Sequence, residues 1–193
     1  AMPGMPDEVV KALEHVKVPP PPAKPKAPDK ARVRLETSKG PVTVELNGKA
    51  APLHVKSFLH LAKMGYYDNT VFHRFEALSG NGQGRIIQGG DPLSKTSKLA
   101  QYFGSGGPGY QVPRERNELT HEAMVLAMAR GPDPDSAGSQ FYLTMDPVPH
   151  LDQGDGYTVF GKVVEGQANL LKLQKGDKLK KAVVVADKKS GQK

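Results

Sequence analysis

The side chains that most often carry out chemistry are sparse in this sequence, and their spacing restricts what they could do. The chain contains no cysteine, which excludes thiol nucleophiles, disulfides and cysteine-based zinc or iron–sulfur sites. Its six histidines form no His-x-x-x-His pair on a predicted helix, the spacing that a helical zinc site needs. Asp133 and Asp135 lie among prolines, and Asp152 and Asp155 lie among glycines. Such pairs can do acid–base work or bind Ca²⁺, but aspartate in tight turns is the commoner arrangement, so we expect no metal and no cofactor.

A glycine-rich segment could cradle a phosphate group instead. Residues Gly104–Gly109 satisfy the G-x-G-x-x-G pattern of dinucleotide-binding proteins. That pattern binds pyrophosphate only where a strand leads into it and a helix follows. Here Pro108 lies inside the pattern and neither element flanks it. We therefore expect a flexible loop and no nucleotide.

The strongest remaining candidate is a basic residue beside an aromatic one. In a strand, Phe72 and Arg74 would point to one face, and Val71, His73 and Phe75 would point to the other. An arginine that emerges beside an aromatic ring on a sheet surface is more often an ordinary exposed charge. Taken alone, this segment leaves the function open.

The elements that would position these residues follow from the spacing of apolar side chains. Apolar and polar residues alternate in residues 31–46 on either side of Ser38-Lys39-Gly40, which predicts a β-hairpin. From Pro52 to Met64 the apolar spacing changes to three and four, which predicts an amphipathic helix ended by Gly65. A second helix is expected within Val163–Leu173. Further short strands are expected at Thr70–Phe75, Arg85–Gln88, Met124–Ala129, Gln140–Thr144, Thr158–Val164 and Leu179–Val185. Many short strands and few helices predict a mainly β fold, an antiparallel barrel or sandwich.

The first 30 residues differ in composition from the rest and contain eight of the 17 prolines. Asp7–Lys17 could form about three helical turns with one apolar face. A helix that short is marginal alone in water, so it needs a partner in this protein or in another chain. Pro19–Pro22 impose a polyproline II conformation. We interpret this stretch as a tether in preference to a ligand for a proline-binding module.

The net charge of +7 is concentrated at the other end of the chain. Residues 172–193 contain eight lysines and two aspartates. Lysines beside an apolar run such as Ala182–Val185 are typical of edge strands. They do not alternate with aromatic residues as a nucleic-acid stacking platform requires, so we expect no nucleic acid. The chain is thus interpreted as an N-terminal helix and linker (1–30), one domain (31–187) and a basic tail (188–193).

Two kinds of targeting segment are not visible. No apolar run is long enough to cross a bilayer. No basic segment followed by an apolar stretch stands at the start, as a secretory signal would require. We favour the cytoplasm, with export as the alternative if a leader was removed from the natural chain.

Five motifs follow one another in an order that rarely arises by coincidence. They are Phe72-His73-Arg74, Ile86-Ile87-Gln88-Gly89-Gly90-Asp91, Met124–Arg130, Asp135–Tyr142, and His150-Leu151-Asp152 with Tyr157–Val163. Over roughly residues 31–187 the sequence resembles the cyclophilin family of peptidyl-prolyl cis–trans isomerases, bacterial members in particular. The resemblance implies a closed eight-stranded antiparallel β-barrel capped by two α-helices. It also implies rotamase activity on X–Pro bonds of unfolded or flexible polypeptides, as a folding helper.

The same resemblance implies a role for each site residue. Arg74 is the catalytic residue, since a fixed cation that donates to the prolyl nitrogen favours the twisted amide. Gln88 matches the residue that holds the arginine and meets the substrate backbone. Ile86, Tyr142 and Leu151 match the proline pocket, although without the family pattern they would be interpreted as core. The other substrate-binding residues implied are Ala129, Arg130, Gln140, His150, Tyr157, Phe72 and His73. For Phe72 and His73 we expect packing support to be the main role.

Three departures from the family pattern affect the pocket. Thirteen residues separate Arg74 from Gln88, more than in short members of the family. Arg85 stands where a phenylalanine usually lines the pocket, and Phe75 or Leu78 could fold back to fill that place. His150 replaces a tryptophan that binds the macrocyclic inhibitor cyclosporin, so we expect that binding to be weakened.

Two functions of different kinds therefore remain. The first is an active isomerase that uses Arg74. The second is a proline-peptide binding or scaffold module with weak or no turnover, suggested by Arg85. If Arg85 and Arg130 both lie near the groove, they should favour an acidic residue before the proline.

Overall fold

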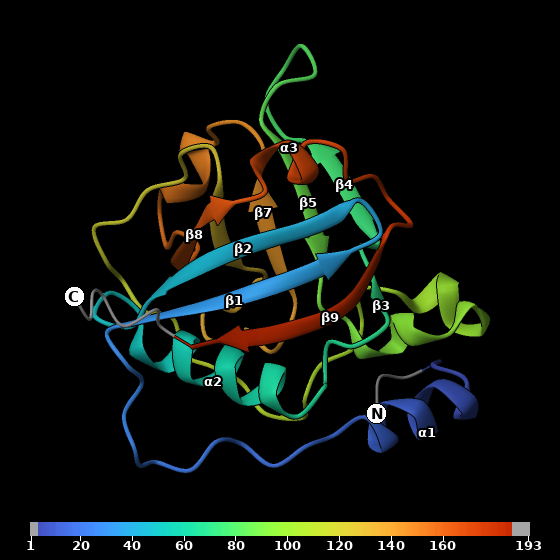
Figure 1. Cartoon of the computed structure of the whole chain (residues 1–193). Coiled ribbons are helices and arrows are strands. Elements are labelled where there is room, and N and C mark those ends of the chain that lie inside the picture. Colours follow the sequence, from blue (N-terminus) through green and yellow to red (C-terminus); the bar gives the residue numbers. More distant parts are fainter. Residues whose placement is uncertain (1–3, 187–193) are drawn as a thin grey trace.

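Nine strands form one antiparallel sheet that curls around a central core. The computed structural model describes residues 4–186 of the chain. Neighbouring strands are hydrogen-bonded in the order β3-β9-β1-β2-β8-β6-β7-β5-β4, and α2 and α3 lie at opposite ends of the curl (Figure 1). The strands are β1 (Lys30–Thr37), β2 (Gly40–Asn47), β3 (Thr70–Val71), β4 (Arg74–Ala77), β5 (Arg85–Gly89), β6 (Val125–Met128), β7 (Phe141–Thr144), β8 (Val159–Glu165) and β9 (Lys178–Val185). The mainly β fold and the strand positions expected from the sequence are confirmed, except at Thr70–Phe75.

The closed eight-stranded barrel expected from the resemblance is wrong in two respects. The sheet has nine strands, and in the described part of the chain the edge strands β3 and β4 do not pair with each other. The strand expected at Thr70–Phe75 is interrupted because Phe72 exchanges both of its backbone hydrogen bonds (2.8 Å each) with Gly176 and Asp177 beside β9. Arg74 then pairs with β5 at the other edge. Within residues 4–186 the chain itself joins the two edges, and no hydrogen-bond ladder closes them.

The helices also follow the sequence pattern, with one shorter than expected. Helix α2 (Pro52–Lys63) confirms the amphipathic helix, and Gly65 adopts a φ of +71° just after its end. The carboxylate of Glu115, from a distant loop, accepts two of the free N–H groups in its first turn at 2.8 and 3.0 Å. The second helix is limited to α3 (Gln167–Leu170), because β8 continues to Glu165.

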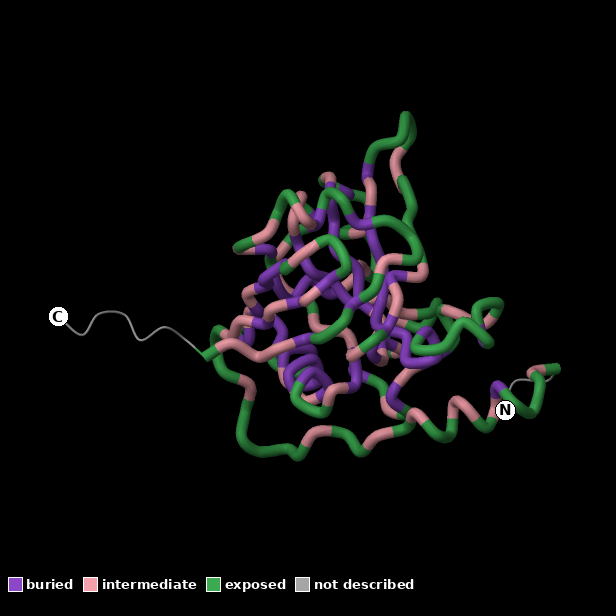
Figure 2. The backbone as a smooth tube through the Cα atoms, turned by 45° about the vertical axis from the view of Figure 1, so that its right-hand side comes forward, coloured by how far each residue is buried: buried purple, intermediate pink, exposed green. Residues whose placement is uncertain are grey.

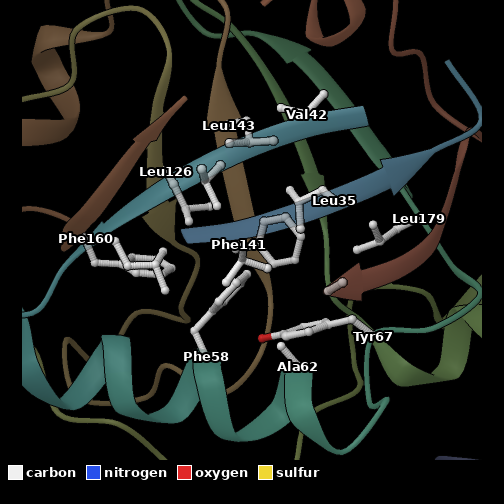
Figure 3. Close-up of a cluster of buried hydrophobic side chains, with 14 of the residues drawn as sticks. Leu35, Val42, Phe58, Ala62, Tyr67, Leu126, Phe141, Leu143, Phe160 and Leu179 are labelled. Carbon is white, nitrogen blue, oxygen red and sulfur yellow. The ribbon is translucent and has the colours of Figure 1, made fainter. Parts of the chain in front are cut away.

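The main core fills the curl between the sheet and α2 (Figure 3). Phe58 of α2 lies at its centre, with ring-centroid distances of 5.1 Å to Tyr67, 5.6 Å to Phe141 and 5.5 Å to Phe160. All four rings are fully buried. Full burial of one such side chain stabilises a fold by about 1.5–3 kcal/mol.

A second apolar cluster lies on the opposite face of the same strands. Ile87 and Leu143 belong to the main core, whereas their chain neighbours Ile86 and Tyr142 belong to the second cluster. This division arises because successive side chains of a strand point to opposite faces. Partly buried residues complete the second cluster, namely Leu78, Leu119, Ala129, Leu151 and Tyr157.

The N-terminal segment lies against the domain. Helix α1 (Asp7–His15) packs on two short 3-10 helices, η1 (Pro92–Lys95) and η2 (Ser97–Tyr102), with Val9 fully buried. The partner that a short helix requires is therefore within the same chain. From α1 a mostly exposed stretch runs beneath the domain to β1 (Figure 2). The expected tail at 188–193 lies outside the described residues.

The described helices, all within residues 4–186, include none that is both long enough and apolar enough to cross a membrane.

The central position of Phe58 predicts a large effect on stability. Phe58→Ala should lower the free energy of unfolding by about 3–5 kcal/mol, because it removes contacts to three buried rings and leaves a cavity. Leu53 is on the same helix and 47% exposed, so Leu53→Ala should change stability by less than about 0.5 kcal/mol. Urea unfolding followed by circular dichroism measures both values. Equal losses in the two variants would contradict the assignment of Phe58 to the core.

Candidate functional site

Arg74 begins β4 and stands directly opposite Gln88 of β5. Its Nη1 donates a hydrogen bond to the side-chain oxygen of Gln88 at 3.1 Å. Its Nε lies 3.8 Å from the carboxylate of Glu76, and its side chain is 44% exposed. The pairing of β4 with β5 therefore presents a fixed guanidinium to solvent, held from one side.

A line of amide side chains extends from this contact. The Nε2 of Gln88, which is only 8% exposed, donates to Oε1 of Gln140 at 3.2 Å. The Nε2 of Gln140 in turn donates to the carbonyls of Gly104 and Gly106 at 2.8 and 2.9 Å. Each amide uses its oxygen toward Arg74 and its N–H groups away from it. This direction leaves the guanidinium as the donor at the end of the line.

Asp91 fixes the other end of this line. Its buried carboxylate accepts hydrogen bonds from the N–H groups of Leu93 (2.8 Å), Gly104 (2.6 Å) and Gly106 (3.3 Å). A side chain at Gly106 would collide with that carboxylate. Asp91 follows the predicted site residue Gln88 in the Gly89-Gly90-Asp91 motif, but the sequence did not indicate this role for it. The glycine-rich segment, interpreted from the sequence as a flexible loop, is thus anchored at two of its residues.

A groove of about 720 Å³ opens beside this line. Gln88, Gln140, Ala129 and Arg130 line it together with residues 104–111, which we call the groove wall. Four residues assigned to substrate binding from the sequence therefore share one groove. A larger hollow of about 870 Å³ around β2 and β8 contains none of the predicted site residues.

The second apolar cluster supplies the apolar part of the site. Ile86 and Tyr142 are almost fully buried in it, while Leu151 and Tyr157 are partly buried against it. Leu78 packs on the same cluster, whereas Phe75 is 38% exposed. Of the two residues considered for the place of the missing phenylalanine, Leu78 is the one that reaches the cluster.

Arg85 turns away from this cluster and forms an ion pair. Its Nε and Nη2 donate to the two carboxylate oxygens of Asp146 at 2.8 and 3.0 Å. These hydrogen bonds from Arg85 lower the pKa of Asp146 to about 2. The expectation that Arg85 adds positive charge to the groove is wrong, because a carboxylate neutralises it.

A buried polar network holds Tyr142 in place. His121 lies 2.6 Å from the Tyr142 hydroxyl through Nε2 and 2.7 Å from the Asp152 carboxylate through Nδ1. Burial lowers the pKa of His121 and raises the pKa of Tyr142 well above its usual value. We therefore assign a neutral imidazole whose Nδ1–H donates to Asp152 and whose Nε2 accepts from Tyr142. No spacing in the sequence links these three residues, so only the fold could bring them together.

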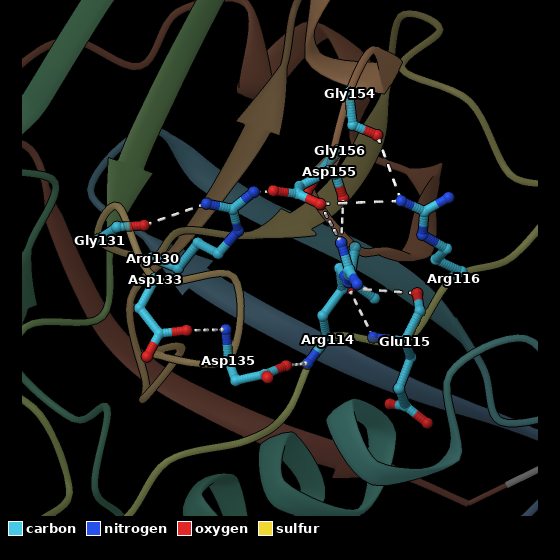
Figure 4. A network of polar contacts seen from close by, with 11 residues as sticks. Arg114, Glu115, Arg116, Arg130, Gly131, Asp133, Asp135, Gly154, Asp155 and Gly156 are labelled. Atoms are coloured by element: carbon cyan, nitrogen blue, oxygen red, sulfur yellow. Dashed lines mark hydrogen bonds and ion pairs between the residues drawn. The ribbon is translucent and has the colours of Figure 1, made fainter.

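Arg130, which lines the groove, is held by contacts with neighbouring loops. Its guanidinium carbon lies 4.3 Å from the centre of the Tyr157 ring, and its Nη2 donates to the carbonyl of Gly156 at 2.7 Å. Arg114 joins the same region, since its Nη1 donates to the Asp155 carboxylate at 2.6 Å (Figure 4). These contacts fix the position of Tyr157 beside Tyr142.

Phe72, His73 and His150 belong neither to the groove lining nor to the second apolar cluster. Phe72 is fully buried in the main core, which agrees with the packing role that was put first for it. His73 has a buried Nδ1 that finds no hydrogen-bond partner among the described residues, and burial lowers the pKa of its ring. His150 is exposed on η3 (Pro149–Asp152), next to Leu151.

Comparisons with known proteins agree with this fold. The family model described as "Cyclophilin type peptidyl-prolyl cis-trans isomerase/CLD" matches residues 32–189. Peptidyl-prolyl cis-trans isomerase CYP18-2 of Arabidopsis thaliana is 39% identical over 73% of this chain and 79% of its own length. A peptidyl-prolyl cis-trans isomerase-like 2 of Cryptococcus neoformans is 40% identical over 76% of this chain, which spans about a quarter (24%) of that relative.

Solved structures give the same result. The crystal structure of a cyclophilin type isomerase from Cryptosporidium parvum superimposes with a TM-score of 0.68 at 30% sequence identity, covering 82% of this chain and 99% of that chain. The chain belongs to the cyclophilin family.

The neutral state of His121 predicts a specific dependence of stability on pH. The pKa of His121 is lowered in the folded protein, so below about pH 6.5 the unfolded chain takes up this proton first. Acidification from about pH 7 to pH 5 should therefore destabilise the native chain more steeply than a His121→Gln variant. Urea unfolding at a series of pH values measures both slopes. Parallel curves would mean that His121 is not held neutral.

Proposed function

We propose that this chain is an active peptidyl-prolyl cis–trans isomerase that acts on proline-containing flexible polypeptides. The observation that supports this most directly is the half-exposed guanidinium of Arg74 beside an apolar cluster. It is held by Gln88, which is held in turn by Gln140. A structure of the Cryptosporidium parvum relative was determined in the presence of the dipeptide Ala-Pro, with 31% identity and a TM-score of 0.67. Ala-Pro is a ligand of the class proposed here.

The reaction requires no bond to be made or broken. Rotation about the X–Pro bond is slow because amide resonance must be lost, with a barrier of about 18–20 kcal/mol. In the twisted amide the prolyl nitrogen regains a lone pair. A donor that meets this lone pair stabilises the twisted state and neither planar state, which is the condition for catalysis.

Arg74 has the properties that this donor needs. A guanidinium carries five N–H bonds and stays charged. Among the described residues, its hydrogen-bond acceptor is Gln88 alone, so further N–H groups remain for a substrate. Gln88 and Gln140 hold the cation before the substrate arrives, and such preorganisation is the usual source of electrostatic stabilisation.

The apolar cluster would receive the proline ring. Tyr142, Leu151 and Tyr157 surround Ile86 on the outer face of the sheet. The hydroxyl of Tyr142 is directed to His121, which leaves the ring of Tyr142 for apolar contact. The alternative, a binding module with weak turnover, was suggested by Arg85 in place of a pocket phenylalanine. Because Leu78 packs on this cluster and Arg85 pairs with Asp146 instead, Arg85 gives little support to that alternative.

Removal of the Arg74 side chain should abolish most of the activity. Arg74→Ala is expected to lower kcat/KM by about 10²–10³-fold, the usual loss for one preorganised charge donor. NMR exchange spectroscopy on a short Ala-Pro peptide measures the rate. Arg34→Ala is the matched control, since Arg34 is 40% exposed on a strand and pairs with a glutamate two residues later, as Arg74 does.

Two results would contradict this proposal. Equal rates for the native chain and Arg74→Ala would remove Arg74 from the mechanism. Peptide-induced chemical shift changes without any accelerated cis–trans exchange would instead support a binding module.

We also propose that cyclosporin binds weakly. His150 occupies the place where the family often has a tryptophan, and it is exposed at the margin of the apolar cluster. His150→Trp should raise the affinity at least about tenfold, because a tryptophan anchor is worth more than 1.4 kcal/mol at many interfaces. Inhibitor titration by calorimetry tests this, and an unchanged affinity would show that another residue limits binding.

A further inference from the structure

The N-terminal segment packs on η1 and η2, the two short helices that precede the groove wall (residues 104–111) in the chain. Val9 of α1 is fully buried and packs in one cluster with Leu93 of η1 and Leu99 of η2. Figures 1 and 2 show α1 beside these short helices, outside the curled sheet. Partly buried residues from both sides complete the contact, namely Met5, Ala12, Leu13, Tyr102 and Phe103.

The residues after α1 continue this contact onto the wall itself. The N–H of Val18 donates to the carbonyl of Pro108 at 3.0 Å. The side chain of Lys17 lies against Gly109, so closely that a side chain at Gly109 would overlap it. The carbonyl of Pro19 lies 2.8 Å from Nε2 of His60 on α2. Residues 5–19 are therefore attached at η2, at the wall and at α2.

The wall connects directly to the catalytic line. Residues 104–111 line the groove, and the carbonyls of Gly104 and Gly106 hold the side chain of Gln140. Gln140 holds Gln88, and Gln88 holds Arg74. Residues 103–110 thus receive contacts from the N-terminal segment on the outside and make contacts with the site on the inside.

We propose that residues Met5–Pro19 are a positioning element for the substrate groove. They hold residues 103–110 in the conformation in which the carbonyls of Gly104 and Gly106 bind the side chain of Gln140. Gln140 in turn positions Gln88, which positions the guanidinium of Arg74. The segment touches no substrate, so Val9 is a positioning residue. The inference rests on the proposed isomerase function, and it adds that the region preceding the β-domain contributes to that function.

A matched pair of substitutions on α1 tests this. Val9→Asn places a polar group in the buried contact, whereas Lys11→Asn places the same residue on the exposed face of the same helix. Val9→Asn is expected to lower kcat/KM for an Ala-Pro peptide by about three- to tenfold, the range that residues acting through others usually show. Lys11→Asn should leave kcat/KM unchanged, and the conservative substitution Val9→Ile should keep it close to the native value.

Hydrogen exchange provides a second readout that needs no activity. The amides of Gly104 and Gly106 donate to Asp91, and in Val9→Asn they should exchange at least about tenfold faster while core amides of β2 and β7 keep their rates. If Val9→Asn does not fold, the smaller change Val9→Ala provides the same comparison.

The outcomes separate this inference from the proposed function. Unchanged exchange of Gly104 and Gly106 would overturn the inference, and so would faster exchange with an unchanged kcat/KM. Faster exchange and weaker binding of the Ala-Pro peptide in a chain without any turnover would overturn the isomerase function and retain the positioning role.

Discussion

The site depends on one chain of hydrogen bonds. It begins at the buried carboxylate of Asp91, passes through the glycine-rich wall to Gln140 and Gln88, and ends at Arg74. Every amide in it donates in one direction, so the guanidinium is left as a donor with an exposed side. A long, flexible side chain at a sheet edge would otherwise sample many rotamers, and this constraint removes that freedom before a substrate binds.

The two faces of the sheet have different roles: one packs against the core and the other carries the apolar part of the site. The inner face packs on α2 and provides most of the stability, because rings such as Phe58 and Phe141 are fully buried there. The outer face presents Ile86 and Tyr142 in a smaller cluster beside Arg74. A buried hydroxyl on that face requires a partner, and neutral His121 supplies it. Because successive side chains of a strand point to opposite faces, the same strands contribute to both the core and the site.

Features set by local interactions were predictable from the sequence, and features set by distant segments were not. Helix α2 and most strands were predicted well, because apolar spacing and Gly65 act locally. The prediction of one strand at Thr70–Phe75 was wrong because Phe72 bonds to a turn about a hundred residues later. The charge of Arg85 was misjudged for the same reason, since Asp146 is distant in the sequence.

By itself the sequence determined the family, the mainly β fold, and the identities of Arg74, Gln88 and Gln140 as candidates, because residue types and local order are sufficient for these. Only the tertiary structure decided that Phe72 belongs to the core, that Leu78 reaches the apolar cluster, and that Asp91 and His121 support the site. It also decided that α1 packs within its own chain. Burial and hydrogen-bond partners are set by segments that meet only when the sheet curls, and no local spacing encodes such meetings.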